Sequence, residues 1–210
     1  STGIILPDDY LVKVAAAVHA HGGLMVLDCI ASGTIWVDMK ATGVDAILSA
    51  PQKGESILRT FVRAISLTLL FFSLFTGWTG PACSSLIMLS ERGDYATRNT
   101  TSTSMVINMR KWLEVMDSYN AGGFAYYTTM PTDALNLFRD AALETKELGF
   151  GKAKQLAWDL GNECRDMMKS KGLRTVSAPG YEAPGVNVWY TQSPDMFQKF
   201  KAEGFQVAAG

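Results

Sequence analysis

Apolar residues recur at helical spacing near the start of the chain and then change to short continuous runs. The pattern predicts a helix over residues 8–20, followed by strands over 24–27, 46–49 and 85–89. The strands are apolar throughout rather than alternating, which is typical of a sheet covered by helices on both faces. We therefore expect an α/β fold.

Helical spacing dominates the second half of the chain. It predicts helices over 104–117, 132–148 and 150–171, with glycines near residue 150 separating the last two. The methionines and Trp112 of the first of these helices are expected to pack in the core or against a partner subunit.

The remainder of the chain reads as a smaller C-terminal lobe. Strands are expected over 174–178 and 186–190, and Ser193 opens a final helix toward Lys201. This divides the chain into a partial large domain, a linking helix and a partial small domain, over 1–148, 149–172 and 173–210.

The composition is that of a globular protein with one sizeable core. Of the 210 residues, 48% are hydrophobic and 19% are charged, and the formal net charge is -1. Such a chain lacks the basic field that attracts nucleic acid or anionic membrane, so neither is an expected partner. The three cysteines lack metal-site spacing and read as reduced thiols, so no metal is expected. His19 and His21 are expected to be exposed or to cap the first helix.

Two residues carry the candidate chemistry. Asp28 follows the apolar run 24–27, and Lys53 follows the predicted strand 46–49. A carboxylate can keep a pyridine nitrogen protonated, and a lysine amine of depressed pKa can form a Schiff base. Open α/β sheets place their ligands at the carboxyl ends of neighbouring strands. The pair suits pyridoxal phosphate, whereas alone each residue reads more often as a turn former or a solvated charge.

The motifs around these residues resemble the class V pyridoxal-phosphate-dependent aminotransferases, above all the alanine–glyoxylate and serine–pyruvate aminotransferases. The resemblance rests on segments 1–3, 26–32 and 45–53 and extends over nearly the whole chain. It implies part of the fold type I large domain, with a mostly parallel sheet between helices, and part of a small α/β C-terminal domain. It also implies amino transfer from alanine or serine to glyoxylate or pyruvate, in a homodimer with a shared active site.

The resemblance implies roles for six residues. Lys53 would hold the cofactor and carry a proton between substrate and cofactor carbons, Asp28 would keep the ring nitrogen protonated, and Ile30 would press the ring face. Gln52 would lie near the cofactor phosphate. Tyr126 and Thr129 would donate hydrogen bonds to the phosphate of the neighbouring protomer. From the residues alone, the segment that contains Tyr126 and Thr129 reads instead as an aromatic strand edge followed by a turn.

Residues 55–77 have no counterpart in the family, and removing them joins Lys53-Gly54 to Trp78 as the family reads. A membrane span is one interpretation, but the strongly apolar part, 64–75, is shorter than the roughly 20 residues required. A functional apolar insertion would have to bury itself or aggregate. We favour a retained intron, because codons for 54–56 can hold a splice donor, those for 67–75 a pyrimidine tract and those for 76–77 an acceptor.

Two alternatives to the aminotransferase stay open at this stage. Another class V enzyme, such as a desulfurase or lyase, would need a catalytic cysteine on a mobile loop. A degenerate or membrane-associated product without enzymatic activity would be defined by 55–77. The family's glycine-containing phosphate loop and its arginine-containing segment fall outside the sequence, so we expect this chain to be nearly inactive alone. Peroxisome, mitochondrion and cytoplasm are all compatible with the sequence.

Overall fold

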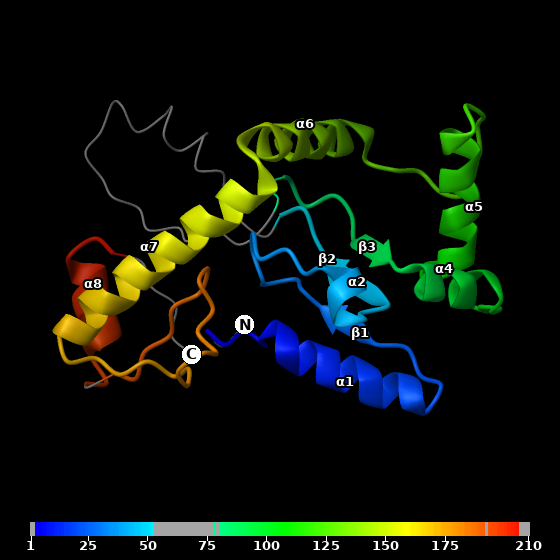
Figure 1. The fold of residues 1–210 in the computed structure, drawn as a ribbon. Coiled ribbons are helices and arrows are strands. Elements are labelled where there is room, and N and C mark those ends of the chain that lie inside the picture. Colours follow the sequence, from blue (N-terminus) through cyan, green and yellow to red (C-terminus); the bar gives the residue numbers. More distant parts are fainter. Residues whose placement is uncertain (1–2, 53–77, 79, 192, 206–210) are drawn as a thin grey trace.

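A computed structural model describes residues 3–52, 78, 80–191 and 193–205 (Figure 1). Three strands form one sheet, and helices surround it. The elements in chain order are α1 (Asp8–Ala20), β1 (Val26–Asp28), α2 (Met39–Thr42), β2 (Ala46–Ser49), β3 (Leu86–Leu89), α4 (Glu91–Arg98), α5 (Met109–Asn120), α6 (Thr132–Leu148), α7 (Phe150–Ser170) and α8 (Met196–Ala202). The predicted α/β class is confirmed.

The sheet has the strand order β1-β2-β3. β1 runs parallel to β2, with Val26 opposite Ala46, and β3 runs antiparallel to β2, with Leu89 opposite Ala46. An antiparallel edge strand on an otherwise parallel sheet is common in α/β folds. The parallel pair is the part that matters for a site, because β1 and β2 end at the same edge.

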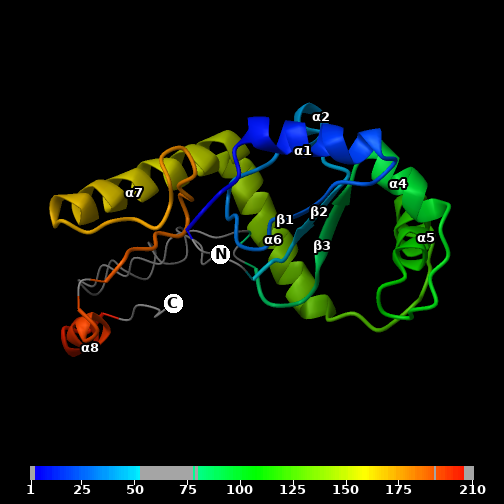
Figure 2. The ribbon, with the colours of Figure 1, turned by 90° about the horizontal axis from the view of Figure 1, so that it is seen from below.

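One face of the sheet is covered better than the other. On one side lie α1 and α2 (Figure 2), and the core there contains Leu11, Val44 and Ile47. Val26 and Ile87 point to the opposite face and are 54% and 41% exposed. Among the described residues, the face of Val26 and Ile87 is therefore less covered than the face of Ile47, although Ala46 and Leu48 of the central strand are half-buried there.

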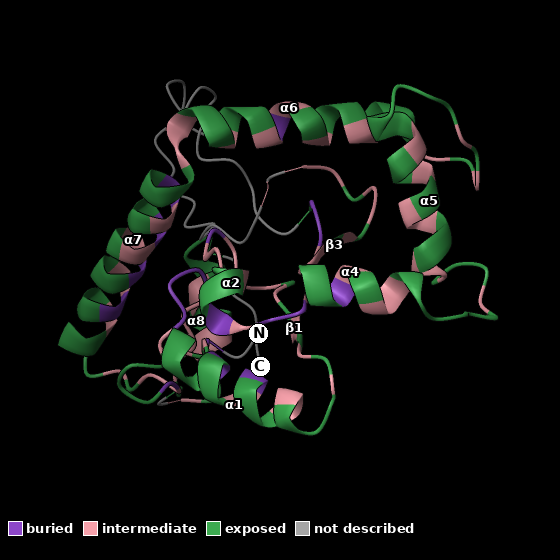
Figure 3. Ribbon diagram, turned by 45° about the vertical axis from the view of Figure 1, so that its right-hand side comes forward, coloured by how far each residue is buried: buried purple, intermediate pink, exposed green. Residues whose placement is uncertain are grey.

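The helices α5 and α6 bury little of their surface, as Figure 3 shows. By contrast, α7 buries a stripe of residues four positions apart: Ala153, Ala157, Gly161 and Arg165. At the end of this stripe, Arg165 donates to the carbonyl of Ala183 at 2.9 Å. The stripe therefore joins α7 to the C-terminal lobe.

Three of the four long helices agree with the sequence pattern. The predictions 8–20 and 132–148 are confirmed, and α7 ends one residue before the predicted end. The helix predicted over 104–117 is wrong at its start, because α5 begins at Met109 and runs to Asn120. The side chain of Asn108 accepts a hydrogen bond from the amide of Lys111 at 3.3 Å, which caps the helix there.

The two strands predicted in the C-terminal lobe do not form. Only an isolated bridge between Thr175 and Trp189 joins these segments. The Thr175 hydroxyl accepts a hydrogen bond from the amide of Ser177 at 3.3 Å, so the backbone turns just beyond the bridge. The final helix is confirmed as α8.

Two short helices escape sequence patterning because caps, not apolar spacing, define them. Asp38 accepts from the amides of Lys40 and Ala41 at the start of α2, and Ser90 accepts from Gly93 in α4. None of the helices in the described ranges has the length and apolar character to cross a membrane. The interpretations placed on 55–77 lie outside the described residues.

Candidate active site

Asp28 is the last residue of β1, where its backbone pairs with Leu48 of β2. The sequence pattern placed Asp28 just after a strand over 24–27, whereas the strand is Val26–Asp28. The side chain is exposed, and its Oδ1 atom accepts a hydrogen bond from the Ile30 amide at 2.9 Å. The carboxylate is therefore held at the strand end and open to a ligand.

A tight turn follows Asp28. The Cys29 amide still donates to the Leu48 carbonyl at 2.8 Å, and the Ser32 amide then donates to the Cys29 carbonyl at 3.1 Å. The turn presents Ile30, which is 38% exposed, next to the Asp28 carboxylate. An acid and an aliphatic side chain thus stand together at the carboxyl end of β1.

The neighbouring strand β2 leads into the segment predicted to bind the cofactor. It ends at Ser49, and Ala50 and Pro51 are buried while Gln52 is exposed. Lys53 lies outside the described residues. Because β1 and β2 are parallel, Asp28 at the end of β1 and Gln52 just beyond the end of β2 belong to the same edge of the sheet.

Tyr126 and Thr129 lie on the connection between α5 and α6. Their hydroxyl oxygens are 3.0 Å apart, and Tyr126 is 69% exposed. The segment around them forms no strand, so the alternative interpretation as an aromatic strand edge is wrong. Two hydroxyls so close together can both reach one anionic group.

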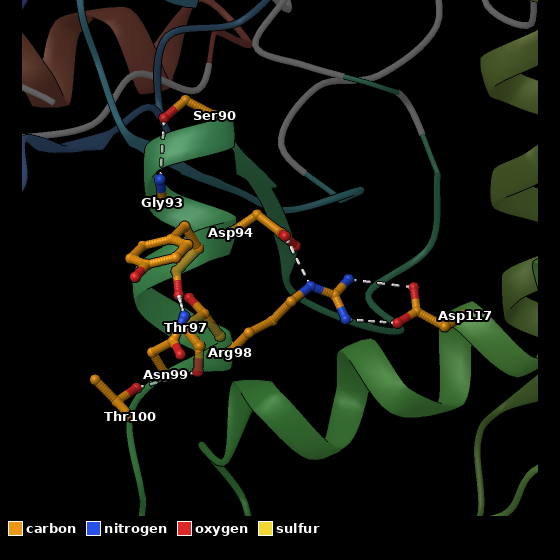
Figure 4. Close-up of polar contacts among 9 residues, drawn as sticks. Ser90, Gly93, Asp94, Thr97, Arg98, Asn99, Thr100 and Asp117 are labelled. Carbon is orange, nitrogen blue, oxygen red and sulfur yellow. Dashed lines mark hydrogen bonds and ion pairs between the residues drawn. The ribbon is translucent and has the colours of Figure 1, made fainter.

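A guanidinium fixes the helix that precedes this connection. Figure 4 shows Arg98 of α4 between Asp94 of the same helix and Asp117 of α5. Arg98 donates to Asp94 at 2.7 Å and to the two carboxylate oxygens of Asp117 at 2.6 and 3.2 Å. These hydrogen bonds lower the pKa of Asp117. No local sequence signal predicts this contact, because Arg98 and Asp117 are 19 positions apart.

A hollow of about 250 Å³ opens between α5 and the connection that follows it. Tyr126 is part of its lining, which consists of Lys111, Glu114, Val115, Ala125, Tyr126 and Tyr127. The Tyr127 hydroxyl donates to the Met105 carbonyl, and its ring meets Trp112 edge-on at 5.3 Å. The segment that carries Tyr126 is therefore anchored to α5 and to the connection that precedes it.

The cysteines do not support desulfurase or lyase chemistry. All three are free and none is fully exposed. Burial raises the pKa of Cys29, with a smaller contribution from the Asp28 charge, and burial also raises the pKa of Cys164. A reactive cysteine requires the opposite shift, toward the thiolate. Cys83 is half-buried beside the Ser84 hydroxyl.

The expectation for the histidines needs correction. His19 is partly buried, and its Nε2 atom lies 2.7 Å from the carboxylate of Asp45. His21 is exposed at the end of α1. The His19 contact lies at the opposite edge of the sheet from Asp28, since it involves the residue before β2. It is therefore structural.

The described residues at the carboxyl edge fit pyridoxal phosphate. The open carboxylate of Asp28 suits a protonated pyridine nitrogen, and Ile30 offers an apolar surface to a ring. In the described part of the chain, hydrogen bonds to the Asp28 side chain involve Oδ1 alone, which leaves Oδ2 for a ligand.

No model of a known protein family matches the sequence. Alanine–glyoxylate aminotransferase 1 of Saccharomyces cerevisiae is 31% identical over 142 residues, which cover 62% of this chain and 36% of that protein. The crystal structure of alanine–glyoxylate aminotransferase from Nostoc sp. matches all of this chain and 50% of its own, with 17% identity and a TM-score of 0.75. PLP-bound phosphoserine aminotransferase from Trichomonas vaginalis matches 90% of this chain and 46% of its own, with 15% identity and a TM-score of 0.59.

The chain thus spans half or less of the length of these proteins. The fold agrees with that of the solved aminotransferases, and the sequence match points to the same enzymes. Both confirm the resemblance to the class V aminotransferases that the motifs around Asp28 and Lys53 indicated. This chain is similar in sequence to alanine–glyoxylate aminotransferase 1 of Saccharomyces cerevisiae and shares the fold of solved aminotransferases.

Proposed function

We propose that the protein containing this chain is a pyridoxal-phosphate-dependent aminotransferase. The observation that carries the proposal is the open Asp28 carboxylate at the end of β1, beside the parallel strand that leads to Lys53. The similarity to alanine–glyoxylate aminotransferase favours alanine or serine as the amino donor and glyoxylate or pyruvate as the acceptor.

Each side chain has a separate task in this proposal. When bound, pyridoxal phosphate supplies a ring that withdraws electrons from the substrate carbon. Asp28 holds the proton on the ring nitrogen, Ile30 packs on the ring, and Gln52 donates near the phosphate. The Lys53 amine attaches the cofactor, and once released it carries the proton from the substrate carbon as a general base and acid.

We also propose that the active site is completed by a second copy of the chain. Tyr126 and Thr129 form a hydroxyl pair that the protomer leaves exposed. Exposed apolar residues also lie on α5 and on the two connections that flank it: Met105, Val106, Ile107, Met116 and Phe124. We call this set the α5 surface. A subunit docked on it would bring the hydroxyl pair to the partner's cofactor phosphate.

Trapping the cofactor on its lysine tests the function directly. The protein containing this chain, with the family's missing segments present and Gly54 joined to Trp78, is incubated with pyridoxal phosphate, reduced with borohydride and mapped by peptide mass spectrometry. We expect the adduct on Lys53 above all other lysines. Asp28→Asn is expected to reduce the Lys53 adduct, because the variant loses the charge that holds the ring nitrogen protonated.

Asp38→Asn is the matched control, because Asp38 is an exposed aspartate that only caps α2. It is expected to leave the Lys53 adduct unchanged. Adducts spread evenly over surface lysines, or an Asp28→Asn variant that traps as well as the parent, would show that the proposed site is wrong.

A further inference from the structure

The loop that follows β1 decides where the Asp28 carboxylate faces. The Asp28 backbone is fixed by its pairing with Leu48 of β2, whereas its Oδ1 atom accepts a hydrogen bond from the Ile30 amide at 2.9 Å. Ile30 belongs to residues 29–38, which connect β1 to α2 and which we call the β1–α2 loop. Whatever holds this loop therefore also holds the carboxylate and the aliphatic side chain beside it.

Further along, the β1–α2 loop is tied to the start of α7. Thr34 is 8% exposed, and its hydroxyl donates to the Ala153 carbonyl at 3.3 Å. The Trp36 indole donates to the Phe150 carbonyl at 2.9 Å, and the rings of these two residues meet edge-on with their centroids 5.4 Å apart. The Lys154 ammonium group donates in turn to the Trp36 carbonyl at 3.4 Å. Both hydrogen bonds and an aromatic contact thus join the loop to the first turns of the helix.

The stretch between these contacts and Ile30 is folded tightly. The Ser32 amide donates to the Cys29 carbonyl at 3.1 Å, and the Ile35 amide donates to the Ser32 carbonyl at 3.3 Å. Between the two turns, Gly33 has a φ of 68°, a left-handed conformation that glycine adopts without steric cost. Because successive hydrogen-bonded turns leave little slack, a displacement at the α7 contacts reaches Ile30.

The helix α7 is a firm support for the loop. Arg165 is 4% exposed and donates to the Ala183 carbonyl at 2.9 Å and to the Asn187 Oδ1 atom at 3.0 Å. These contacts seat α7 against the C-terminal lobe. The β1–α2 loop therefore connects the sheet to a helix whose own position is fixed.

We infer that Thr34 and Trp36 are positioning residues, which hold the Asp28 carboxylate and the Ile30 side chain where the cofactor ring meets them. The positioning role rests on the proposed function of Asp28 and Ile30. Thr34 and Trp36 do not touch the ring in this scheme but act through the loop that they tie to α7. Small displacements at a reacting centre are costly, so loosening the loop weakens the hold on the ring more than it weakens the fold.

Amide hydrogen exchange tests the anchoring without any cofactor, in the protein that contains this chain. The Ile30 amide reports the hydrogen bond to Asp28, and the Cys29 amide, which donates to the Leu48 carbonyl at 2.8 Å, reports the adjacent sheet. Trp36→Ala removes the indole hydrogen bond and the ring contact together. It is expected to lower the protection of the Ile30 amide by about tenfold relative to that of the Cys29 amide.

Two milder variants and a matched control accompany Trp36→Ala. Trp36→Phe keeps a ring but loses the donor, and is expected to recover part of the Ile30 protection. Thr34→Val keeps the side-chain volume and removes the hydroxyl, so it is expected to lower the same protection by about threefold. Thr42→Val is the control, because Thr42 is 2% exposed and donates to the Asp38 carbonyl at 2.7 Å rather than to α7. It is expected to leave the protection ratio unchanged.

Visible circular dichroism of bound pyridoxal phosphate tests the consequence for the site. The cofactor is achiral, so the strength of its band reports how firmly the protein fixes the ring. Trp36→Ala is expected to lose most of the band per cofactor bound, and Trp36→Phe to recover much of it. Thr42→Val is expected to keep the band of the parent.

The outcomes separate the positioning role from the proposed function. Folded Trp36→Ala and Thr34→Val variants that keep the Ile30 protection would overturn the positioning role, and so would variants that lose this protection but keep the cofactor band. If Trp36→Ala does not fold, Trp36→Phe and Thr34→Val decide by the same two measurements. If the parent itself binds no cofactor while the Ile30 protection falls in the variants, the proposed function fails and the anchoring of the loop to α7 stands.

Discussion

Asp45 is a buried carboxylate at the start of β2 that joins three elements. Its side chain is 3% exposed, and Oδ2 accepts from the Met25 amide at 2.8 Å and lies 2.7 Å from His19 of α1. Oδ1 accepts from the Ser90 hydroxyl at 3.2 Å, and Arg92 lies 3.9 Å away. A buried charge is tolerated only when it is paired and hydrogen-bonded, and here both conditions hold.

Asp45→Asn is expected to destabilise the protein by about 3 kcal/mol, because the change leaves buried donors without their charged acceptor. The measurement is the free energy of unfolding in urea. Asp9→Asn removes only an exposed pair with Lys13 and should cost less than about 0.5 kcal/mol. Equal effects of the two substitutions would contradict the role given to Asp45.

The same residue makes stability depend on pH. Burial raises the pKa of Asp45, but hydrogen bonds from Met25, His19 and Ser90, together with the His19 charge, outweigh burial and bring it below its ordinary value of 3.8. A carboxyl whose pKa is lower in the folded state stabilises the fold above its unfolded pKa, and that stabilisation is lost as pH falls through the folded pKa.

The loss is therefore expected below about pH 4, where the unfolded carboxyl begins to take up its proton. Urea unfolding measured from about pH 6 down to about pH 2 should show a steeper fall for the parent than for Asp45→Asn. Parallel curves for the two proteins would mean that Asp45 is not the group responsible.

At the scale of elements, the contact between α7 and the C-terminal lobe depends on one glycine. A Cβ atom added at Gly161 would stand 2.5 Å from the carbonyl oxygen of Pro184, which is backbone and cannot move aside cheaply. Gly151 lies in the same helix and would place a Cβ atom in open space. Gly161 is therefore needed for the close contact with Pro184, whereas nothing near Gly151 requires a glycine.

Gly161→Ala is expected to lower the free energy of unfolding by about 2 kcal/mol through overpacking. Gly151→Ala is expected to raise it by as much as about 1 kcal/mol, because alanine favours the helix. Chemical denaturation of both variants checks the pair. A stabilising Gly161→Ala substitution would show that α7 does not press against Pro184.

Sequence patterning predicts those helices and strands whose apolar residues lie on one face and pack against the neighbouring layer of the fold. The helix α1 follows its stripe from Leu11 to Ala15, and both strand positions of the parallel pair are near those predicted. Sequence patterning fails where a polar side chain fixes the backbone conformation by a hydrogen bond. Asn108 does so at the start of α5, and Thr175 does so in the C-terminal lobe. Caps and turns act over two or three residues, which is too short for periodicity to register.

The candidate site was likewise predictable only where its residues belong to a local pattern in the sequence. Asp28 and Ile30 could be located because strand ends and short motifs are local in the chain, and the structure places both at the carboxyl edge. The contact of Arg98 with Asp117 could not, because it joins residues 19 positions apart. The roles of the site residues stay predictions until the cofactor is bound.

At the scale of the whole molecule, the most exposed of the apolar residues lie on or beside α5. Val106, Ile107 and Phe124 are between 74% and 77% exposed, which is more than a protein surface usually tolerates in one region. The Trp112 indole donates to the Val106 carbonyl at 3.1 Å and so holds this residue in place beside α5. An ordered apolar surface of this kind suits a partner subunit better than solvent.

Introducing charge into the α5 surface is therefore expected to prevent self-association. Ile107→Asp should shift the chain from dimer to monomer in sedimentation velocity, because a carboxylate buried in an apolar interface would lack a partner. Val12→Asp offers a control, since Val12 is 43% exposed and lies on α1, a different helix from α5 (Figure 1). The fold of each variant is verified by circular dichroism. If Val12→Asp dissociates the dimer and Ile107→Asp does not, the subunits meet through α1, and Tyr126 and Thr129 cannot serve a neighbouring site.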